Sequence, residues 1–164
     1  MILKEIRLRR SIRNYKKDIV PDELIAELIK AAQFAPNSHH NRSWEFMIIK
    51  NADTKNTLYD LLGQGYLKAA PVLILPLIDT TRSLRPVQDL SLASGNIFIQ
   101  ATSVGLGTVW KNIPDGKRAE IKRLLKIPED FLFINIIPVG YPNTIRKPHI
   151  DNDFDIKKIH FEKW

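Results

Sequence analysis

Hydrophobic positions along the chain follow two spacings, one typical of helices and the other typical of buried strands. In residues 21–35, apolar side chains recur every three or four positions, after an opening proline and two acidic residues that suit a helix start. The same spacing predicts helices over 54–62, 89–104 and 116–125. Gly105 is a suitable C-terminal cap for the helix that precedes it.

Three shorter runs are nearly continuous in apolar residues and rich in β-branched side chains, as strands buried on both faces are. These runs are residues 46–49, 72–78 and 131–139. Helices and strands alternate along the whole chain. We therefore expect a mixed α and β architecture in a single domain that covers residues 1–164.

Both ends of the chain also carry apolar side chains. Ile2, Leu3 and Ile6 fit one face of a short N-terminal helix. In the last part of the chain, apolar side chains alternate with polar ones and would be costly to leave in water. We expect this tail to pack on another surface, for which a second subunit is a candidate. The apolar residues of the tail are Ile156, Ile159, Phe161 and Trp164.

The composition of the 164 residues excludes several kinds of chemistry. There is no cysteine, which removes disulfides, zinc thiolate sites, iron–sulfur clusters and thiol catalysis, so any redox reaction needs a bound cofactor. The longest apolar run, residues 69–78, is too short for a membrane span and contains two prolines. The N-terminus lacks the continuous apolar stretch of a secretory signal. We therefore expect a cytoplasmic protein without a membrane partner.

The net charge of +7 indicates anionic partners, and many of the basic residues fall into two clusters. The first is RLRRSIRNYKK, residues 7–17, in which several arginines and a serine suit a phosphate group. The second is the pair Arg146 and Lys147, after the last predicted strand. Each cluster alone would also fit a solvated surface. Nucleic acid is a weaker candidate, because no aromatic platform, recognition helix or zinc finger accompanies the arginines.

A third polar segment, APNSHHNRSWEF at residues 35–46, follows the first long helix and precedes a strand. It combines two histidines, two asparagines, an arginine and a tryptophan. A loop with only a connecting role would favour Gly, Ser and Lys. The mixture of hydrogen-bonding groups with an aromatic face suggests that this loop holds a planar polar molecule.

Other motifs lack the residues that their functions require. GLGTVW at 105–110 ends a helix and has a tryptophan at the third glycine position, so it is not a Rossmann fingerprint, although its glycines would let a flat ligand approach the backbone. Residues 151–162 place acids as a calcium loop does, but Ile156 replaces the required glycine. The histidines lack metal-binding spacing, and Ser38 is not in a nucleophile elbow.

Taken in chain order, five segments resemble the nitroreductase family of FMN-dependent oxidoreductases: RRSIRNY, FAPNSHHNRSWEFMII, the predicted helix from Asp89 with Asn96, GLGTVWKNIP and IPVGYPNTIRKP. The resemblance implies an α+β fold, with a mixed or antiparallel sheet wrapped by helices, in an intertwined homodimer with FMN at its interface. It also implies NADH or NADPH as electron donor. An electron-poor small molecule, such as a nitroaromatic or a quinone, would be the acceptor in a ping-pong cycle.

The resemblance assigns roles to the polar segments. The N-terminal arginines and the second basic pair would hold the FMN phosphate and ribityl chain, the loop of the other subunit would line the flavin ring, and the GLGTVW segment would contact the ring edge. The implied cofactor-binding residues are Arg9, Arg10, Ser11, Arg13, Pro36, Asn37, Ser38, His40, Asn41, Leu106, Gly107, Trp110, Asn112, Arg146 and Lys147.

Two alternatives stay open in the sequence. An ungapped match to the family loop places His40 at the family asparagine, whereas a shifted match places Asn41 there. The chain is also short for the family. A non-catalytic flavin- or nucleotide-binding protein of the same fold is therefore the second hypothesis.

Overall fold

A central sheet organises the computed structural model, which describes residues 2–144 and 146–164. Its strands are β1 (Trp44–Ile49), β2 (Val72–Asp79), β3 (Gly107–Thr108), β4 (Lys111–Asn112), β5 (Phe131–Leu132) and β6 (Asn135–Gly140). The strand order is β1–β2–β6–β3, with β4 also beside β6 and β5 beside β2. Each pairing between these strands is antiparallel. The sheet and its helices confirm the expected fold class.

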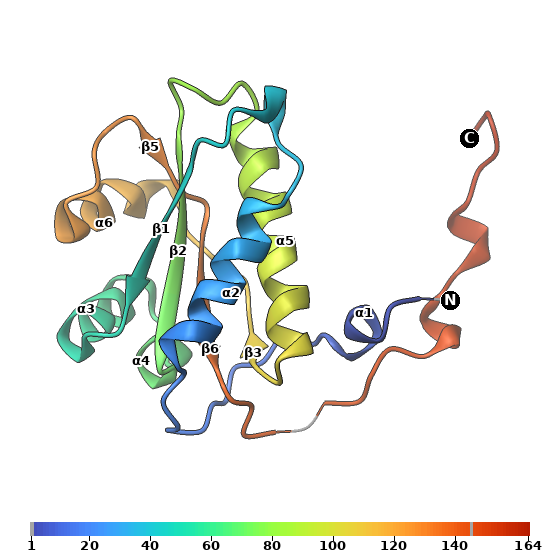
Figure 1. Ribbon diagram of the computed structural model, residues 1–164, viewed down its shortest axis with the longest axis horizontal. Coiled ribbons are helices and arrows are strands. Elements are labelled where there is room, and N and C mark those ends of the chain that lie inside the picture. Colours follow the sequence, from blue (N-terminus) through green and yellow to red (C-terminus); the bar gives the residue numbers. More distant parts are fainter. Residues whose placement is uncertain (1, 145) are drawn as a thin grey trace.

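Helices cover both faces of the sheet (Figure 1). On one face lie α2 (Asp22–Gln33) and α5 (Pro86–Ser103), and on the other lie α3 (Ala52–Leu62), α4 (Tyr66–Ala69) and α6 (Arg118–Leu125). The central strand β2 serves both layers, because Ile74 belongs to the first core cluster while Leu73 and Leu75 belong to the second. This two-sided burial explains why the strand reads as an unbroken apolar run.

The helix predictions are confirmed, with small shifts at the ends. Pro21 is the N-cap of α2, and α5 begins at Pro86, three residues before the predicted start at Asp89. At its C-terminal end, Gly105 adopts a left-handed φ of 75°, and the amide of Leu106 donates to the carbonyl of Ala101 at 2.8 Å. This is the hydrogen-bonded cap that the glycine predicted. A 3-10 turn, η2 (Asp115–Lys117), precedes α6.

The prediction of one strand over 131–139 is wrong, because the structure divides it into β5 and β6. Leu132 pairs with Ile78, and Ile137 pairs with Ile74. Between these two pairs the chain advances by five residues from β5 to β6 but by only four residues in β2. The extra residue is a bulge in the register. Pro76 lies within the part of β2 that faces this interruption, where a missing backbone N–H costs least.

The chain ends lie together to one side of the sheet and its helices (Figure 1). They comprise α1 (Lys4–Leu8) and a tail with the 3-10 turns η3 (Asp151–Asp153) and η4 (Ile156–Lys158). Within one chain the tail stays exposed, with Phe161 85% and Trp164 101% exposed, so its packing against a second subunit stays a prediction. Over the described residues, no helix has the length and apolarity to cross a membrane.

Candidate functional site

The N-terminal arginines follow α1 and are fixed in place by a segment that lies along the sheet. The amide of Ile12 donates to the carbonyl of Thr108 in β3 at 2.9 Å, and the amide of Lys16 donates to Tyr141 just beyond β6 at 2.9 Å. Ser11 and Thr108 form a parallel bridge. The basic segment is thus bound to the end of β3, next to the C-terminal end of α5.

Two buried side chains pack this segment against the strands. Ile12 lies against Gly107, where a Cβ atom would approach Cγ1 of Ile12 to 2.7 Å. The hydroxyl of Tyr15 donates to the carbonyl of Ile12 at 2.6 Å, and burial raises the pKa of this tyrosine, so it stays protonated as a donor. Gly107 therefore serves close backbone packing, in addition to any contact with a ligand.

We expect Gly107→Ala to lower the free energy of unfolding by about 1–3 kcal/mol, because the new methyl group would push Ile12 off β3. Chemical denaturation measures this loss. Gly116→Ala is the matched control, since a methyl group added there would have no other atom within 4 Å and the φ of Gly116 is not left-handed. Equal stability of the two variants would contradict the packing role of Gly107.

A basic cleft forms where this segment meets the chain beyond β6. One hollow of about 270 Å³ has Arg9, Arg10, Ser11, Arg13, Arg146 and His149 in its wall. An adjoining hollow of about 230 Å³ is more apolar and is lined by Leu8, Ile12, Thr102, Gly105, Leu106, Gly107, Pro142 and Thr144, together with Arg10 and Arg146. Arg10 and Arg146 therefore join the two hollows into one site.

The cleft combines strong positive charge with a hydrogen-bonding hydroxyl. Four arginines from opposite ends of the sequence line its first hollow, and the lining contains no carboxylate. Guanidinium groups bind phosphate oxygens through charge-assisted, often bidentate hydrogen bonds. The arrangement is therefore chemically suited to a phosphate group with an apolar extension in the second hollow.

The polar loop lies at the opposite end of α5. Its 3-10 turn, η1 (Ser38–His40), is anchored by the amide of Ser38, which donates to Oδ1 of Asp89 at 2.9 Å. Asp89 is buried near the start of α5 and also accepts a hydrogen bond from Ser83 at 2.7 Å. The loop is thus attached to the helix by a buried carboxylate that the sequence did not single out.

The side chains of both asparagines in the loop form hydrogen bonds that fix the conformation of the loop. Oδ1 of Asn41 accepts from the hydroxyl of Ser43 at 2.9 Å, and its Nδ2 donates to the carbonyl of Arg82 at 2.8 Å. Asn37 accepts from the amide of Arg42 at 3.1 Å. His40 is exposed, and among the described residues its ring forms no hydrogen bond. Of the two candidates for the family asparagine, His40 is the one with an uncommitted side chain.

The remaining predicted site residues lie in different surroundings. Trp110 is half-buried and packs edge-on against Phe98, with ring centroids 6.3 Å apart. Asn112 is exposed on β4, Pro36 is exposed in the loop, and Lys147 is exposed beside the cleft without lining it. The structure therefore gathers the arginines, Ser11, Leu106 and Gly107 at one end of α5, and the loop residues at the other.

The two groups do not meet within one chain. The 18 residues of α5 span about 27 Å. The cleft lies at the C-terminal end of this helix, where Thr102 and Gly105 belong to its lining, and the loop is bound at the N-terminal end through Asp89. His149 lines the cleft although the sequence did not indicate it; it follows Arg146 and Lys147 closely, but its only motif in the sequence is the absent metal-binding spacing. In the described ranges, no group of three potential metal ligands is present.

Comparisons with known proteins identify the family and the fold. The model of the nitroreductase family matches residues 6–75 and 57–141. The chain is 38% identical over 169 residues to a Methanothermobacter thermautotrophicus protein with the provisional name NADH dehydrogenase/NAD(P)H nitroreductase, covering 99% of this chain and 87% of that protein. An FMN-dependent nitroreductase from Clostridium difficile R20291 matches with a TM-score of 0.91 and 32% identity over 98% of each chain. An Archaeoglobus fulgidus relative is 32% identical and covers 99% of this chain and 98% of its own.

Proposed function

Because this chain belongs to the nitroreductase family, we propose that its basic cleft holds the phosphate of FMN and that the protein passes electrons from NAD(P)H to a small electron-poor acceptor. The protein is an FMN-dependent NAD(P)H oxidoreductase. Nitroaromatics and quinones are the acceptor classes that we propose, in a ping-pong cycle with one binding region for donor and acceptor.

One observation carries the assignment of the site: arginines from both ends of the sequence line the same hollow. A cluster from one segment alone would fit a solvated surface, but convergence of Arg10 and Arg146 on two adjoining hollows fits an anionic ligand. The phosphate fits the arginine-lined hollow, and the apolar hollow beside Leu106 fits the less polar part of the cofactor.

Bound FMN supplies the hydride and electron chemistry. The protein residues bind and orient the cofactor. Arg9, Arg10, Arg13 and Arg146 would neutralise the phosphate and fix its position, and Leu106 and Gly107 would border the apolar part of the cofactor. For the hydride transfer itself, these residues would need to position the cofactor and would not need to supply an acid–base pair.

We propose that the complete site forms in a homodimer in which α5 of each subunit runs antiparallel to that of its partner. This arrangement would place the loop at residues 37–42 of one subunit beside the cleft of the other. Exposed apolar side chains support it, since Leu84, Val87 and Leu92 lie on or before α5 and the tail exposes many more. The tail of each subunit would then be covered by its partner.

The absorption spectrum of the purified protein tests the function. We expect FMN to be retained at one flavin per chain after excess cofactor is removed, and anaerobic addition of NADH or NADPH to bleach the flavin bands. Reoxidation by a nitroaromatic or quinone, with parallel double-reciprocal plots, would support the ping-pong cycle. Retained FMN without bleaching by either nicotinamide would instead favour a non-catalytic binding protein.

A further inference from the structure

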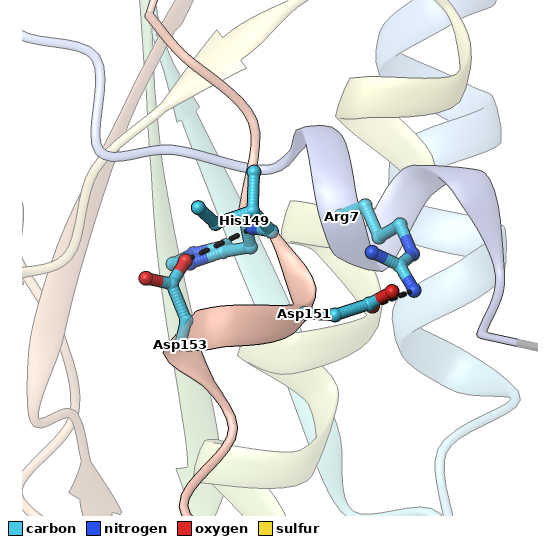
Figure 2. A network of polar contacts seen from close by, with 5 residues as sticks. Arg7, His149, Asp151 and Asp153 are labelled. Carbon is cyan, nitrogen blue, oxygen red and sulfur yellow. Dashed lines mark hydrogen bonds and ion pairs between the residues drawn. The ribbon is translucent and has the colours of Figure 1, made fainter.

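The two chain ends are held together by a small polar network beside the basic cleft (Figure 2). The backbone amide of His149 donates to the carbonyl of Arg7 at 2.8 Å. The Arg7 guanidinium pairs with Asp151 at 2.5 Å, and Nδ1 of His149 lies 3.2 Å from a carboxylate oxygen of Asp153. These contacts fix the position of the His149 ring without using a residue of the sheet.

His149 stands between two hollows. It lines the arginine-rich hollow of the cleft, and it also lines a hollow of about 240 Å³ between α1 and the tail. Because Asp153 engages Nδ1, the other ring nitrogen, Nε2, is the one left for a ligand in the cleft. A histidine thus contributes to the wall of an anion site next to four permanently charged arginines.

The groups that face His149 set the energy of its charged form. From the cleft these are Arg9, Arg10, Arg13 and Arg146, which disfavour a further positive charge. From the chain ends they are Arg7, Asp151 and Asp153. The amide of Ile150 and then the His149 ring lower the pKa of Asp153, which therefore stays a carboxylate that favours a protonated imidazole.

We propose that His149 takes up a proton when a phosphate group enters the cleft, so that phosphate-bearing ligands bind more tightly as the pH falls toward about 6. A phosphate dianion offsets the repulsion from the arginines and adds its own attraction for the imidazolium. The proposal rests on the proposed function in taking FMN as the ligand. It makes His149 a pH-dependent member of the site.

The first test compares FMN affinity in the wild type and in His149→Gln between about pH 6 and pH 8.5. Since a phosphate monoester itself titrates near pH 6, the ratio of the two dissociation constants is the quantity to follow. Near pH 6 we expect the wild type to bind FMN about threefold to fivefold more tightly than His149→Gln does. Near pH 8.5 the two dissociation constants should become equal. Arg123→Gln, on α6 at the other face of the sheet and outside the cleft lining, is the control for loss of a basic side chain and should retain the wild-type profile.

The second test observes the imidazole directly by NMR. Addition of FMN near neutral pH should shift the His149 ring signals toward those of the protonated form, whereas riboflavin, which lacks the phosphate, should not. Asp153→Asn should weaken this response. A ratio of dissociation constants that does not vary with pH, or an unchanged His149 signal with FMN bound, would overturn the proposal.

Inorganic phosphate separates this proposal from the proposed function. If FMN does not bind at any pH, the flavin assignment fails, but a phosphate-dependent shift of the His149 signals would still support the proton uptake. If FMN binds and His149 does not respond, the flavin function stands and the proposal for His149 fails.

Discussion

Replacement of Arg10 by alanine is expected to weaken FMN binding by about tenfold to a hundredfold. Arg10 lines both hollows of the cleft, so its loss removes charge-assisted hydrogen bonds at the point where the phosphate and the apolar part of the ligand meet. Fluorescence titration of apoprotein with FMN measures the change. Riboflavin binding should be almost unaffected, because riboflavin has no phosphate.

Lys17→Ala is the matched control for this variant. It removes the same charge from the same N-terminal segment, but Lys17 is exposed and lines neither hollow of the cleft. If both variants weakened FMN binding equally, the effect would be one of overall charge, and a phosphate site around Arg10 would be contradicted.

Two variants of low activity are expected to restore activity when their subunits are combined in one dimer. Arg10→Ala damages the cleft, and Asn41→Ala releases the loop by removing its contacts with Ser43 and Arg82. We expect Asn41→Ala to lower turnover by about tenfold to a hundredfold, because a displaced loop no longer orders the site. In a mixed dimer, one site carries both lesions and the other carries neither.

The measurement is NADH oxidation at limiting FMN by co-expressed, separately tagged subunits. Random pairing makes half of the dimers mixed, so about a quarter of all sites should be intact. Each variant alone is the control, and wild-type subunits carrying the same tags define full activity. Failure of the mixed dimers to exceed the single variants would show that the cleft and the loop do not form one site across the interface.

Much of the fold was predictable because it depends on local sequence patterns. Helical spacing identified α2, α3 and α5, and unbroken apolar runs identified β1 and β2. The bulge between β5 and β6 was not predictable, since the apolar run continues through Phe133 and only pairing with β2 shows the extra residue. Register is a property of two strands, which a single run of residues does not encode.

The candidate site was predictable as residue types and only in part as geometry. The arginine clusters were recognised, but their convergence depends on how the segment at residues 11–16 lies along β3 and β6. The sequence predicts ligand approach at Gly107, which lines the cleft, but it does not reveal the packing contact with Ile12. The buried carboxylate of Asp89 was missed, because nothing in a helical pattern marks which polar residue anchors a distant loop.

The backbone of the loop has a further consequence for how the protein is built. His39, His40 and Arg42 all have φ between 50° and 54°, in the left-handed region that residues with side chains rarely occupy. Each such conformation stores about 1–3 kcal/mol of strain, which the anchors at Asp89 and Arg82 must hold. The strain lowers the folding stability of the protein, but the shape of the loop is already set before a ligand binds.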